Sequence, residues 1–466
     1  MYFSRTIDRT LSEWARSPDR KPLVLRGARQ TGKSSSIREL GRAFELFLEL
    51  NLERHEDLSL VRACRSPRDL LAALSARHNI EAFPGRTLLF LDEIQESPEA
   101  IGWLRFFRED HPELFVVAAG SLMEVRLEER GFSFPVGRVT FRTLRPLTFL
   151  EFCRALGKDV LAEKLSAALV PQADLPPPLH RQALLLLRDY LFVGGMPEAV
   201  ARWADSGNPA AVRQSQADLL QALAEDIQKY RGAVSVADLE AAFENLRHHY
   251  GLRFRYEGFA PGYKSQRMKD ALGKLEAALL IARVLPTSSI ALPLAARPKS
   301  APKLLPLDVG LAVAAMGTGF VALHSEPLER LLSGRLAEMF AGQQLLAGVA
   351  GEGAAADPLY FWVSESARGN AETDYLVAGP GFPVPVEVKS GASGALKSLH
   401  QFLWRANLDL GLRLHTGGLA DERHRVQMPE GVLEYRLLSL PLYLAEEARR
   451  LIGERSIPRE ALAGGR

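Results

Sequence analysis

Short apolar runs alternate with amphipathic stretches through the first third of the chain. Ile7, Leu11 and Trp14 recur at helical spacing and predict a helix, and the apolar run from Leu23 to Leu25 predicts a short strand behind it. The pattern continues with a run over Phe44 to Leu52, a helical stretch around Leu70 to Ala76, and runs over Thr87 to Leu91 and Phe115 to Ala119. Buried strands that alternate with helices are typical of a parallel α/β sheet.

The pattern changes after Glu151, where leucine and alanine at helical spacing replace the strand-like runs. Four prolines between Val170 and His180 end one helix and begin another. From residue 233 helices are interleaved with basic residues, and from Glu326 a helix leads into further strands. We therefore expect four parts: residues 1–156, 157–232, 233–322 and 323–466.

Composition narrows the class of protein. With 466 residues and 47% hydrophobic content, the chain can form roughly two to four domains with cores of their own, which excludes a disulfide miniprotein and a disordered tail. Lysine and arginine nearly balance aspartate and glutamate. The net charge of +2 therefore provides no global attraction to nucleic acid or to an anionic membrane, and any basic surface must be local.

The cysteine content and the lack of long apolar segments indicate where in the cell the protein works. Cys64 and Cys153 fit neither a disulfide framework nor a thiolate metal site, which indicates a reducing compartment. The N-terminal residues are charged throughout and lack the apolar core of a signal peptide, and no apolar run approaches the ~20 residues that span a bilayer. We expect a cytoplasmic protein without membrane contact.

A phosphate-binding loop follows the first predicted strand. Residues 27–34 match the pattern GxxxxGK[ST] between an apolar run and an expected helix. Glycines let backbone N–H groups face phosphate oxygens, the lysine reaches the β- and γ-phosphates, and the serine hydroxyl binds Mg²⁺. The predicted cofactors are ATP and Mg²⁺, and the predicted binding residues are Gly27, Ala28, Arg29, Gln30, Thr31, Gly32, Lys33, Ser34 and Ser35.

Two acidic residues end the apolar run that begins at Leu88. A buried strand that ends in carboxylates is costly unless a metal and a polarised water offset the desolvation. We assign Asp92 to Mg²⁺ coordination and Glu93 to activation of the attacking water, with a strand end that carries solvated acids as the alternative. Ser121, after the next strand, is a candidate for a hydroxyl beside the γ-phosphate, and a plain turn serine is the alternative.

Arginines between residues 126 and 145 offer a side chain that would complete the nucleotide site in the same or a neighbouring subunit. Arg138 is the first candidate and Arg130 the second, and surface solvation is the alternative for each. An arginine donated between subunits would make the protein a homo-oligomer.

Further short motifs follow along the chain as far as residue 374, in Pro146 to Phe152, Gly194 to Glu198, Asp226-Ile227, Leu307 to Leu311 and Glu372 to Asp374. Together with the loop, the two acids, Gly120-Ser121 and Gly137-Arg138, they resemble a family of prokaryotic AAA-type ATP-binding proteins that carry a C-terminal domain of unknown function. The resemblance covers nearly the whole chain. It implies an AAA-like ATPase module, a helical lid, a winged-helix segment and a nuclease-like C-terminal domain.

Basic residues gather in one segment. Residues 259–303 carry eight lysines and arginines against two acidic residues, a local charge of +6. Within it, Tyr263 to Val284 has apolar residues at helical spacing and basic residues on the other faces, which suits a recognition-type helix that contacts phosphates. The predicted partner is DNA. The alternative is a solvated helix that only packs against the ATPase.

The last part holds a second group of acidic residues. Glu338 lies on an expected helix, Asp374 begins a strand, and Glu387 and Lys389 lie two residues apart on the same face of the next strand. The carboxylates of Asp374, Glu387 and Glu338 are the predicted ligands of a divalent metal, and Lys389 is the predicted catalytic residue at a phosphodiester. This arrangement resembles the PD-(D/E)xK nuclease core, with an inactive nuclease-like fold as the alternative.

Three functions are compatible with these features. The first is an ATPase coupled to DNA binding or processing, the second an ATP-regulated, metal-dependent DNA nuclease, and the third a nucleotide-switched signalling or interaction ATPase. The expected fold class is α/β: a P-loop NTPase with an AAA-like parallel sheet, a helical lid, a winged-helix-like segment and a C-terminal α/β nuclease-like domain.

Overall fold

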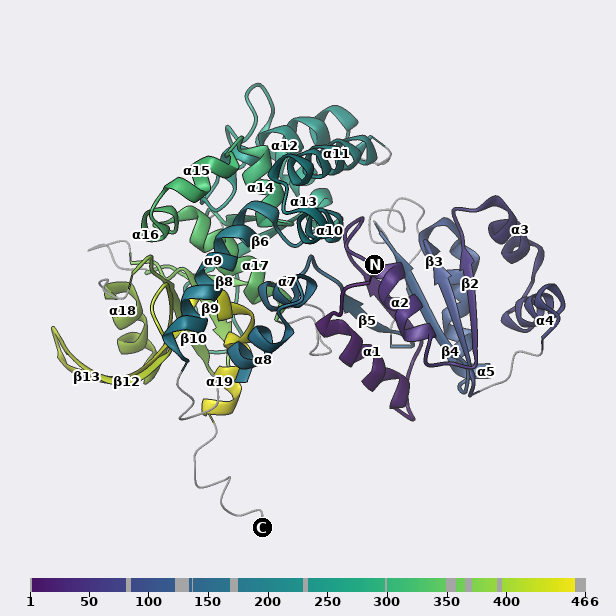
Figure 1. The fold of residues 1–466 in the computed structure, drawn as a ribbon, viewed down its shortest axis with the longest axis horizontal. Helices are drawn as coiled ribbons and strands as arrows, with labels where there is room; N and C mark the ends of the chain where they lie inside the picture. The colour runs from purple at the N-terminus through teal and green to yellow at the C-terminus, as the bar shows by residue number, and fades with distance from the viewer. Residues whose placement is uncertain are drawn as a thin grey trace, which may run out of the picture.

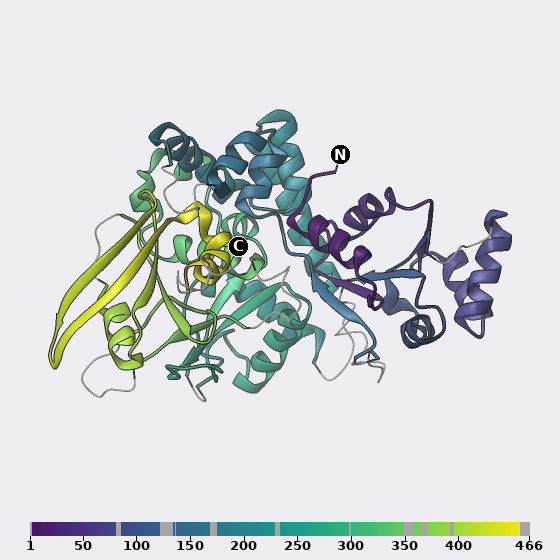
Figure 2. The ribbon, with the colours of Figure 1, turned by 90° about the horizontal axis from the view of Figure 1, so that it is seen from below.

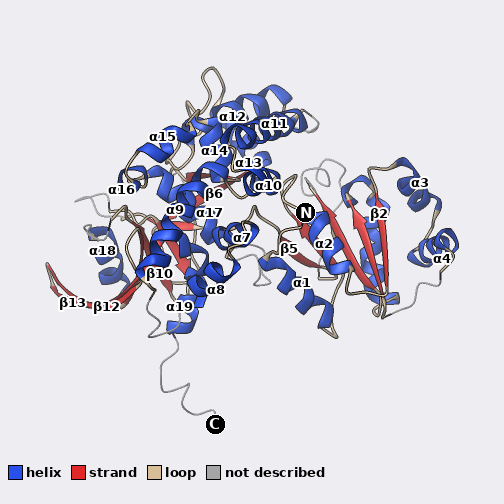
Figure 3. Cartoon of the chain, in the orientation of Figure 1, coloured by secondary structure: helices blue, strands red, loops and turns tan. Residues whose placement is uncertain are grey.

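Figure 1 shows the fold of the protein as a computed structural model. The structure describes residues 2–80, 85–121, 134–135, 137–167, 175–228, 234–297, 300–348, 358–364, 371–391 and 396–456. Within them lie a five-stranded sheet in the N-terminal part and an eight-stranded sheet in the C-terminal part. Helices fill the space between the two sheets (Figures 1 and 3).

The N-terminal sheet has the strand order β2-β3-β4-β1-β5, and every neighbouring pair is parallel. Its strands are β1 (Leu23–Arg26), β2 (Leu46–Asn51), β3 (Thr87–Asp92), β4 (Phe115–Gly120) and β5 (Thr140–Thr143). All six residues of β3 are buried, which explains its continuous apolar sequence up to the terminal acid. The prediction of a parallel α/β sheet is confirmed.

Helices cover both faces of this sheet. Alternate residues of the strands face α1 (Thr6–Arg16) and α2 (Lys33–Gly41) on one side. The residues between them face α3 (His55–Ala63), α4 (Pro67–His78) and α5 (Pro98–Asp110) on the other. The core of this part is therefore a sheet between two helical layers.

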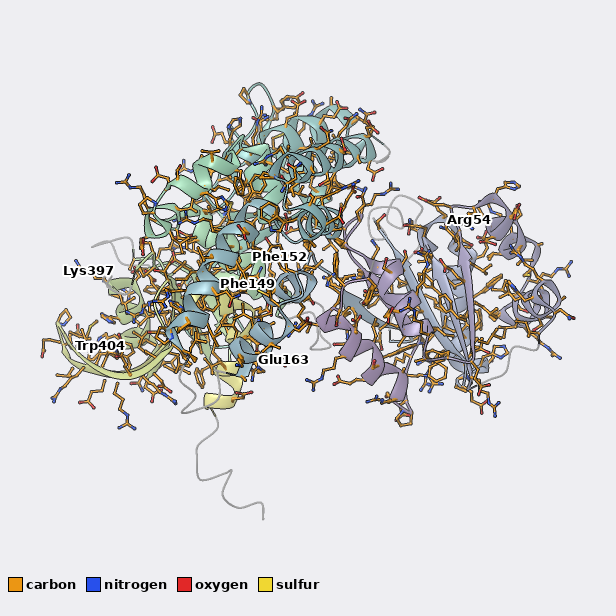
Figure 4. The ribbon with its side chains drawn as sticks, in the orientation of Figure 1. Arg54, Phe149, Phe152, Glu163, Lys397 and Trp404 are labelled. Carbon is orange, nitrogen blue, oxygen red and sulfur yellow. The ribbon has the colours of Figure 1, made fainter. Side chains whose placement is uncertain are left out.

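Helices of the middle part begin with clear capping signals. Proline occupies the first turn of α9 (Pro177–Val193), α10 (Pro197–Ser206) and α11 (Pro209–Ile227), where its missing N–H costs nothing. Phe149 and Phe152 of α7 (Phe149–Ala155) are buried in the core of the helical part and pack edge-on against Tyr190 of α9 (Figure 4). The described residues up to 331 also form α8 (Asp159–Ala167), α12 (Val236–His249), α13 (Ser265–Ala277), α14 (Val309–Ala315), α15 (Phe320–Ser325) and α16 (Leu328–Leu331).

The C-terminal sheet has the order β12-β13-β11-β10-β9-β8-β6-β7. Its strands are β6 (Ile281–Thr287), β7 (Lys303–Pro306), β8 (Tyr360–Trp362), β9 (Tyr375–Ala378), β10 (Pro383–Val388), β11 (Leu410–His415), β12 (Ala420–Met428) and β13 (Gly431–Pro441). The antiparallel hairpin β6–β7 joins the sheet because β6 pairs in parallel with β8. The sheet therefore crosses the boundary expected at residue 322.

Two helices enclose this sheet. Phe361 and Tyr375 belong to the core cluster on the side of α17 (Arg335–Ala347), whereas Trp362 and Leu376 belong to the cluster beside α18 (Lys397–Ala406). The long hairpin β12–β13 extends from the sheet edge (Figure 2). The chain then continues through η2 (Leu442–Glu447) and α19 (Ala448–Ser456). None of the helices that the structure describes is long and apolar enough to cross a bilayer.

Candidate functional site

The predicted phosphate loop lies between β1 and α2, at the carboxyl edge of the five-stranded sheet. A Cβ on Gly27 would lie 2.6 Å from the carbonyl oxygen of Leu144, so only glycine fits there. Gly32 has a φ of +99° and Gln30 one of 61°, both in the left-handed region that curls the backbone before α2. The loop geometry thus explains both glycines of the motif.

Lys33 is buried at the centre of the loop. Its Nζ donates to the carbonyl oxygens of Gly27 at 3.0 Å and Ala28 at 2.9 Å. Burial lowers the pKa of Lys33 to about 8, and the charges of Glu93 and Asp92 oppose that shift. The ammonium is therefore held by weak neutral partners in a place where phosphate oxygens would be stronger ones.

Ser34 and Asp92 meet across the carboxyl edge. The hydroxyl of Ser34, in the first turn of α2, donates to Oδ2 of Asp92 at 2.7 Å, although β4 lies between β1, which leads into α2, and β3, which ends in Asp92. Burial raises the pKa of Asp92. A hydroxyl and a buried carboxylate in contact are the oxygen ligands that Mg²⁺ prefers, so these residues fit the metal predicted for them.

Glu93 is fixed beside this pair in a left-handed conformation, with a φ of 52°. Gln95 donates from Nε2 to Oε2 of Glu93 at 2.6 Å, and the backbone N–H of Ser121 lies 3.5 Å from the same oxygen. The buried hydroxyl of Ser121 has no hydrogen-bond partner among the described residues. The structure thus brings Glu93 and Ser121 together. It adds Gln95, whose only sequence signal is its position two residues after Glu93.

Arg5 is a second residue that the sequence did not reveal. Its guanidinium contacts Glu151 through Nε at 2.8 Å and the carbonyl oxygen of Thr31 through Nη1 at 3.1 Å. Burial acts to raise the pKa of Glu151, but the charge of Arg5 and backbone N–H donors hold it below its usual value. Arg5 therefore supports the phosphate loop from the N-terminal segment.

Arg29 links the same loop to the helical part. Its Nε lies 2.7 Å from Oδ2 of Asp226 on α11, and its Nη2 lies 3.4 Å from Oε1 of Glu53. A Cβ added to Gly32 would lie 3.8 Å from Pro197, the first residue of α10. The phosphate loop thus pairs with α11 and lies beside the start of α10.

Arg138 lies away from these residues. Its Nε pairs with Oε1 of Glu109 at 3.0 Å, and Arg105 pairs with the same carboxylate. Glu109 is near the end of α5, which runs back from the carboxyl edge of β3 toward the start of β4, so the pair lies toward the opposite edge of the sheet. Arg138 therefore does not complete the nucleotide site of its own chain. Arg130 lies outside the described residues.

The C-terminal candidates lie near one another on the eight-stranded sheet. Lys389 donates to Oε1 of Glu387 at 2.6 Å, and Oδ2 of Asp374 accepts from the backbone N–H of Val388 at 2.7 Å. Burial, and then the neighbouring charge of Asp374, raises the pKa of Glu387 to about 7. Glu338, on α17, contacts Lys303.

Lys303 was counted in the basic segment that was expected to contact DNA, but it is buried among these carboxylates. Burial acts to lower its pKa, and the charges of Glu338, Asp374 and Glu372 outweigh that effect and raise the pKa to about 12. In the part of the chain that the structure describes, no three His, Cys, Asp or Glu side chains are arranged to hold a metal ion. The predicted shell of Glu338, Asp374 and Glu387 thus contains an ammonium group.

Comparison with family models divides the chain into three segments. Residues 19–153 match an AAA domain. Residues 184–320 match a domain of unknown function (DUF8612), and residues 333–431 match another (DUF4143). No curated protein matches the chain.

Solved structures give distant likenesses. A Walker-type ATPase of Pyrococcus abyssi is 15% identical, with a TM-score of 0.43 over 67% of this chain and 96% of that one. A signal transduction ATPase with a tetratricopeptide repeat sensor, from Pyrococcus horikoshii, is 12% identical, with a TM-score of 0.28 over 75% of this chain and 47% of that one. The match to the AAA domain spans the phosphate loop, Asp92 and Glu93. The N-terminal part therefore matches an AAA domain over residues 19–153 and has a phosphate-binding loop within that match.

Proposed function

We propose that the protein binds ATP with Mg²⁺ and hydrolyses it at the carboxyl edge of the five-stranded sheet. In this proposal residues 27–35 surround the phosphates, and Lys33 exchanges its carbonyl partners for phosphate oxygens. Ser34 and Asp92 hold Mg²⁺, which neutralises phosphate charge when bound. Glu93 accepts the proton of the attacking water, and Ser121 offers its hydroxyl beside the γ-phosphate.

The observation that carries this proposal is the position of Glu93. The side-chain amide of Gln95, at 2.6 Å, and the backbone N–H of Ser121, at 3.5 Å, hold one carboxylate oxygen of Glu93 in place. The Ser34–Asp92 pair lies beside Glu93, because Asp92 is the preceding residue. A general base needs such a fixed orientation beside the reacting phosphate. The parallel sheet provides this position beside the phosphate because β1, β3 and β4 all end at one edge.

Lys33→Ala tests the binding step. Removal of a charge-assisted contact to phosphate costs about 1.5–3 kcal/mol, which weakens ATP binding by roughly 10- to 100-fold. Isothermal titration with MgATP measures this loss. Lys158→Ala, an exposed lysine outside the loop, is the matched control. Unchanged ATP affinity and turnover in Lys33→Ala would exclude the assigned site.

We further propose that nucleotide binding is transmitted to the helical part, so that the ATPase acts as a switch. Support comes from two neighbours of the phosphate loop in the helical part: Arg29 pairs with Asp226 of α11, and Gly32 lies beside Pro197 of α10. A nucleotide that attracts Arg29 competes with Asp226 for the same guanidinium. Loss of that ion pair would free α11 to move relative to the sheet.

We prefer this switch to a DNA reader because much of the basic segment is engaged within the protein. Arg283 pairs with Glu276, and Arg267 lies 3.6 Å from Asp238. Lys303 is buried. Because Asp238 and the carboxylates around Lys303 lie outside the basic segment, the contacts of Arg267 and Lys303 leave less charge for phosphate than the +6 of the sequence indicated. DNA binding that weakens steeply with salt would favour the DNA-coupled ATPase instead.

A further inference from the structure

The ammonium of Lys303 lies inside the group of carboxylates that the sequence assigned to a divalent metal. Its Nζ is 3.0 Å from Oε2 of Glu338, 3.2 Å from Oε1 of Glu372 and 3.7 Å from Oδ1 of Asp374. These acids come from α17 and from the residues just before β9, whereas Lys303 begins β7. Its side chain is only 7% exposed. We call this group the acidic cluster, together with Glu387.

The surroundings satisfy the ammonium. An ammonium has three N–H donors, and the carbonyl oxygen of Asp374, at 3.5 Å, offers a further acceptor beside the two nearest carboxylates. The rings of Phe361 and Tyr375 lie 5.1 Å and 5.9 Å from Nζ, within the range of cation–π attraction. The pocket is therefore built around a cation that belongs to the protein.

Two more cations reduce the need for a metal. Arg253 pairs with Glu372 at 2.9 Å, and Lys389 pairs with Glu387 at 2.6 Å. Oε2 of Glu387, buried and without a hydrogen-bond partner among the described residues, remains as the acceptor that a further cation would use. The cluster thus retains one ligand position, but most of its charge is already compensated.

A divalent metal does not fit beside Lys303. Mg²⁺ and Ca²⁺ need several oxygens at about 2.0–2.6 Å, and the oxygens of Glu338 and Glu372 are turned toward Nζ instead. An ammonium at that place also repels a second cation. The residues therefore disagree with the metal shell that the nuclease-like pattern implies.

We propose that Lys303 is the resident cation of the acidic cluster and that it excludes a divalent metal from it. The nuclease-like fold then serves as a metal-free scaffold in which Lys303 fastens β7 to α17 and to the residues just before β9. This proposal does not depend on ATP hydrolysis, because none of these residues belongs to the phosphate loop.

Counting bound Mn²⁺ by electron paramagnetic resonance on the full-length, nucleotide-free protein tests the proposal. Wild type is compared with Asp374→Asn, so that Mn²⁺ held at Ser34 and Asp92 counts equally in both. Equal counts are expected. Lys303→Met keeps the length of the side chain and removes its charge. This variant should bind one additional Mn²⁺ at the acidic cluster, with an affinity for Mn²⁺ there at least about tenfold higher than that of wild type. The double variant Lys303→Met/Asp374→Asn should lose it.

Lys389→Met is the matched control, because it also removes a lysine from a cluster carboxylate but leaves Lys303 in place. It should gain no Mn²⁺. A wild-type protein that binds one Mn²⁺ more than Asp374→Asn would overturn the proposal, as would a folded Lys303→Met without additional Mn²⁺. If Lys303→Met does not fold, the comparison of wild type with Asp374→Asn decides alone. Mn²⁺-dependent DNA cleavage that Asp374→Asn abolishes would also overturn it.

Discussion

The guanidinium of Arg29 lies 2.7 Å from the carboxylate of Asp226 and so joins the phosphate loop to α11. Asp226 is buried, whereas Arg29 is partly exposed beside the place proposed for ATP. One ion pair therefore spans the AAA-type domain and the helical part. It gives the proposed switch a specific contact that nucleotide binding would change.

Asp226→Asn should tighten ATP binding. Without the competing carboxylate, Arg29 becomes available to phosphate, and a partly exposed pair worth about 1 kcal/mol corresponds to roughly fivefold in affinity. Titration with MgATP measures the change, and hydrogen exchange in α11 should no longer respond to nucleotide. Glu53→Gln removes the weaker, more exposed partner of Arg29 and should change affinity less than twofold. Unaltered affinity and exchange in Asp226→Asn would exclude this contact as the switch.

Glu151→Ala should destabilise the N-terminal part strongly. It leaves Arg5 buried without its partner, and breaking a buried pair in this way costs about 3–5 kcal/mol. Urea unfolding followed by circular dichroism measures the difference. Glu13→Ala breaks the exposed pair with Arg9 and should cost about 0.5 kcal/mol or less. Similar losses in the two variants would contradict the role given to Arg5.

Stability should fall as pH rises through the range below 8, in part because of Glu446. Burial raises the pKa of this η2 carboxyl to about 8 in the folded protein. Between its ordinary value and 8 the folded state holds the proton that the unfolded state releases, so rising pH favours unfolding, by at most about 1.4 kcal/mol per pH unit. Glu446→Gln should flatten this slope. A wild-type slope in that variant would refute the assignment.

Arg138 can assist hydrolysis only in a neighbouring chain, because its own pair with Glu109 lies toward the other edge of the sheet. If it does, ATP turnover per chain rises with protein concentration in wild type, and Arg138→Ala abolishes the rise. Arg105→Ala, which removes the other arginine on Glu109, should retain it. A concentration-dependent rise that persists in Arg138→Ala would assign the arginine elsewhere.

Most of the five-stranded sheet could be predicted because its information is local. The central strands β1, β3 and β4 are continuous apolar runs, and the phosphate loop has a sequence pattern that its chemistry requires. The parallel arrangement then brings Ser34, Asp92 and Ser121 to one edge. The contact of Gln95 with Glu93 needs the left-handed backbone at Glu93, which no pattern marks.

The C-terminal half was harder to predict because its decisive contacts are distant in sequence. The pairing of Leu285 with Tyr360 adds β6 and β7 to a sheet that was expected to begin after residue 322. Lys303 lies 35 residues before Glu338, so its charge was counted toward a DNA-facing surface. Only the fold shows that this lysine faces inward to carboxylates. A count of charges along a segment says nothing about which of them are buried in ion pairs.

The central claim, hydrolysis of ATP with Glu93 as the base, is tested most directly by Glu93→Gln. The amide keeps the shape and the contact with Gln95 but cannot accept the proton of water. We predict that Glu93→Gln binds MgATP as wild type does and turns it over about 100-fold or more slowly, whereas Glu56→Gln, an exposed control on α3, matches wild type in both. Wild-type turnover in Glu93→Gln would contradict the account.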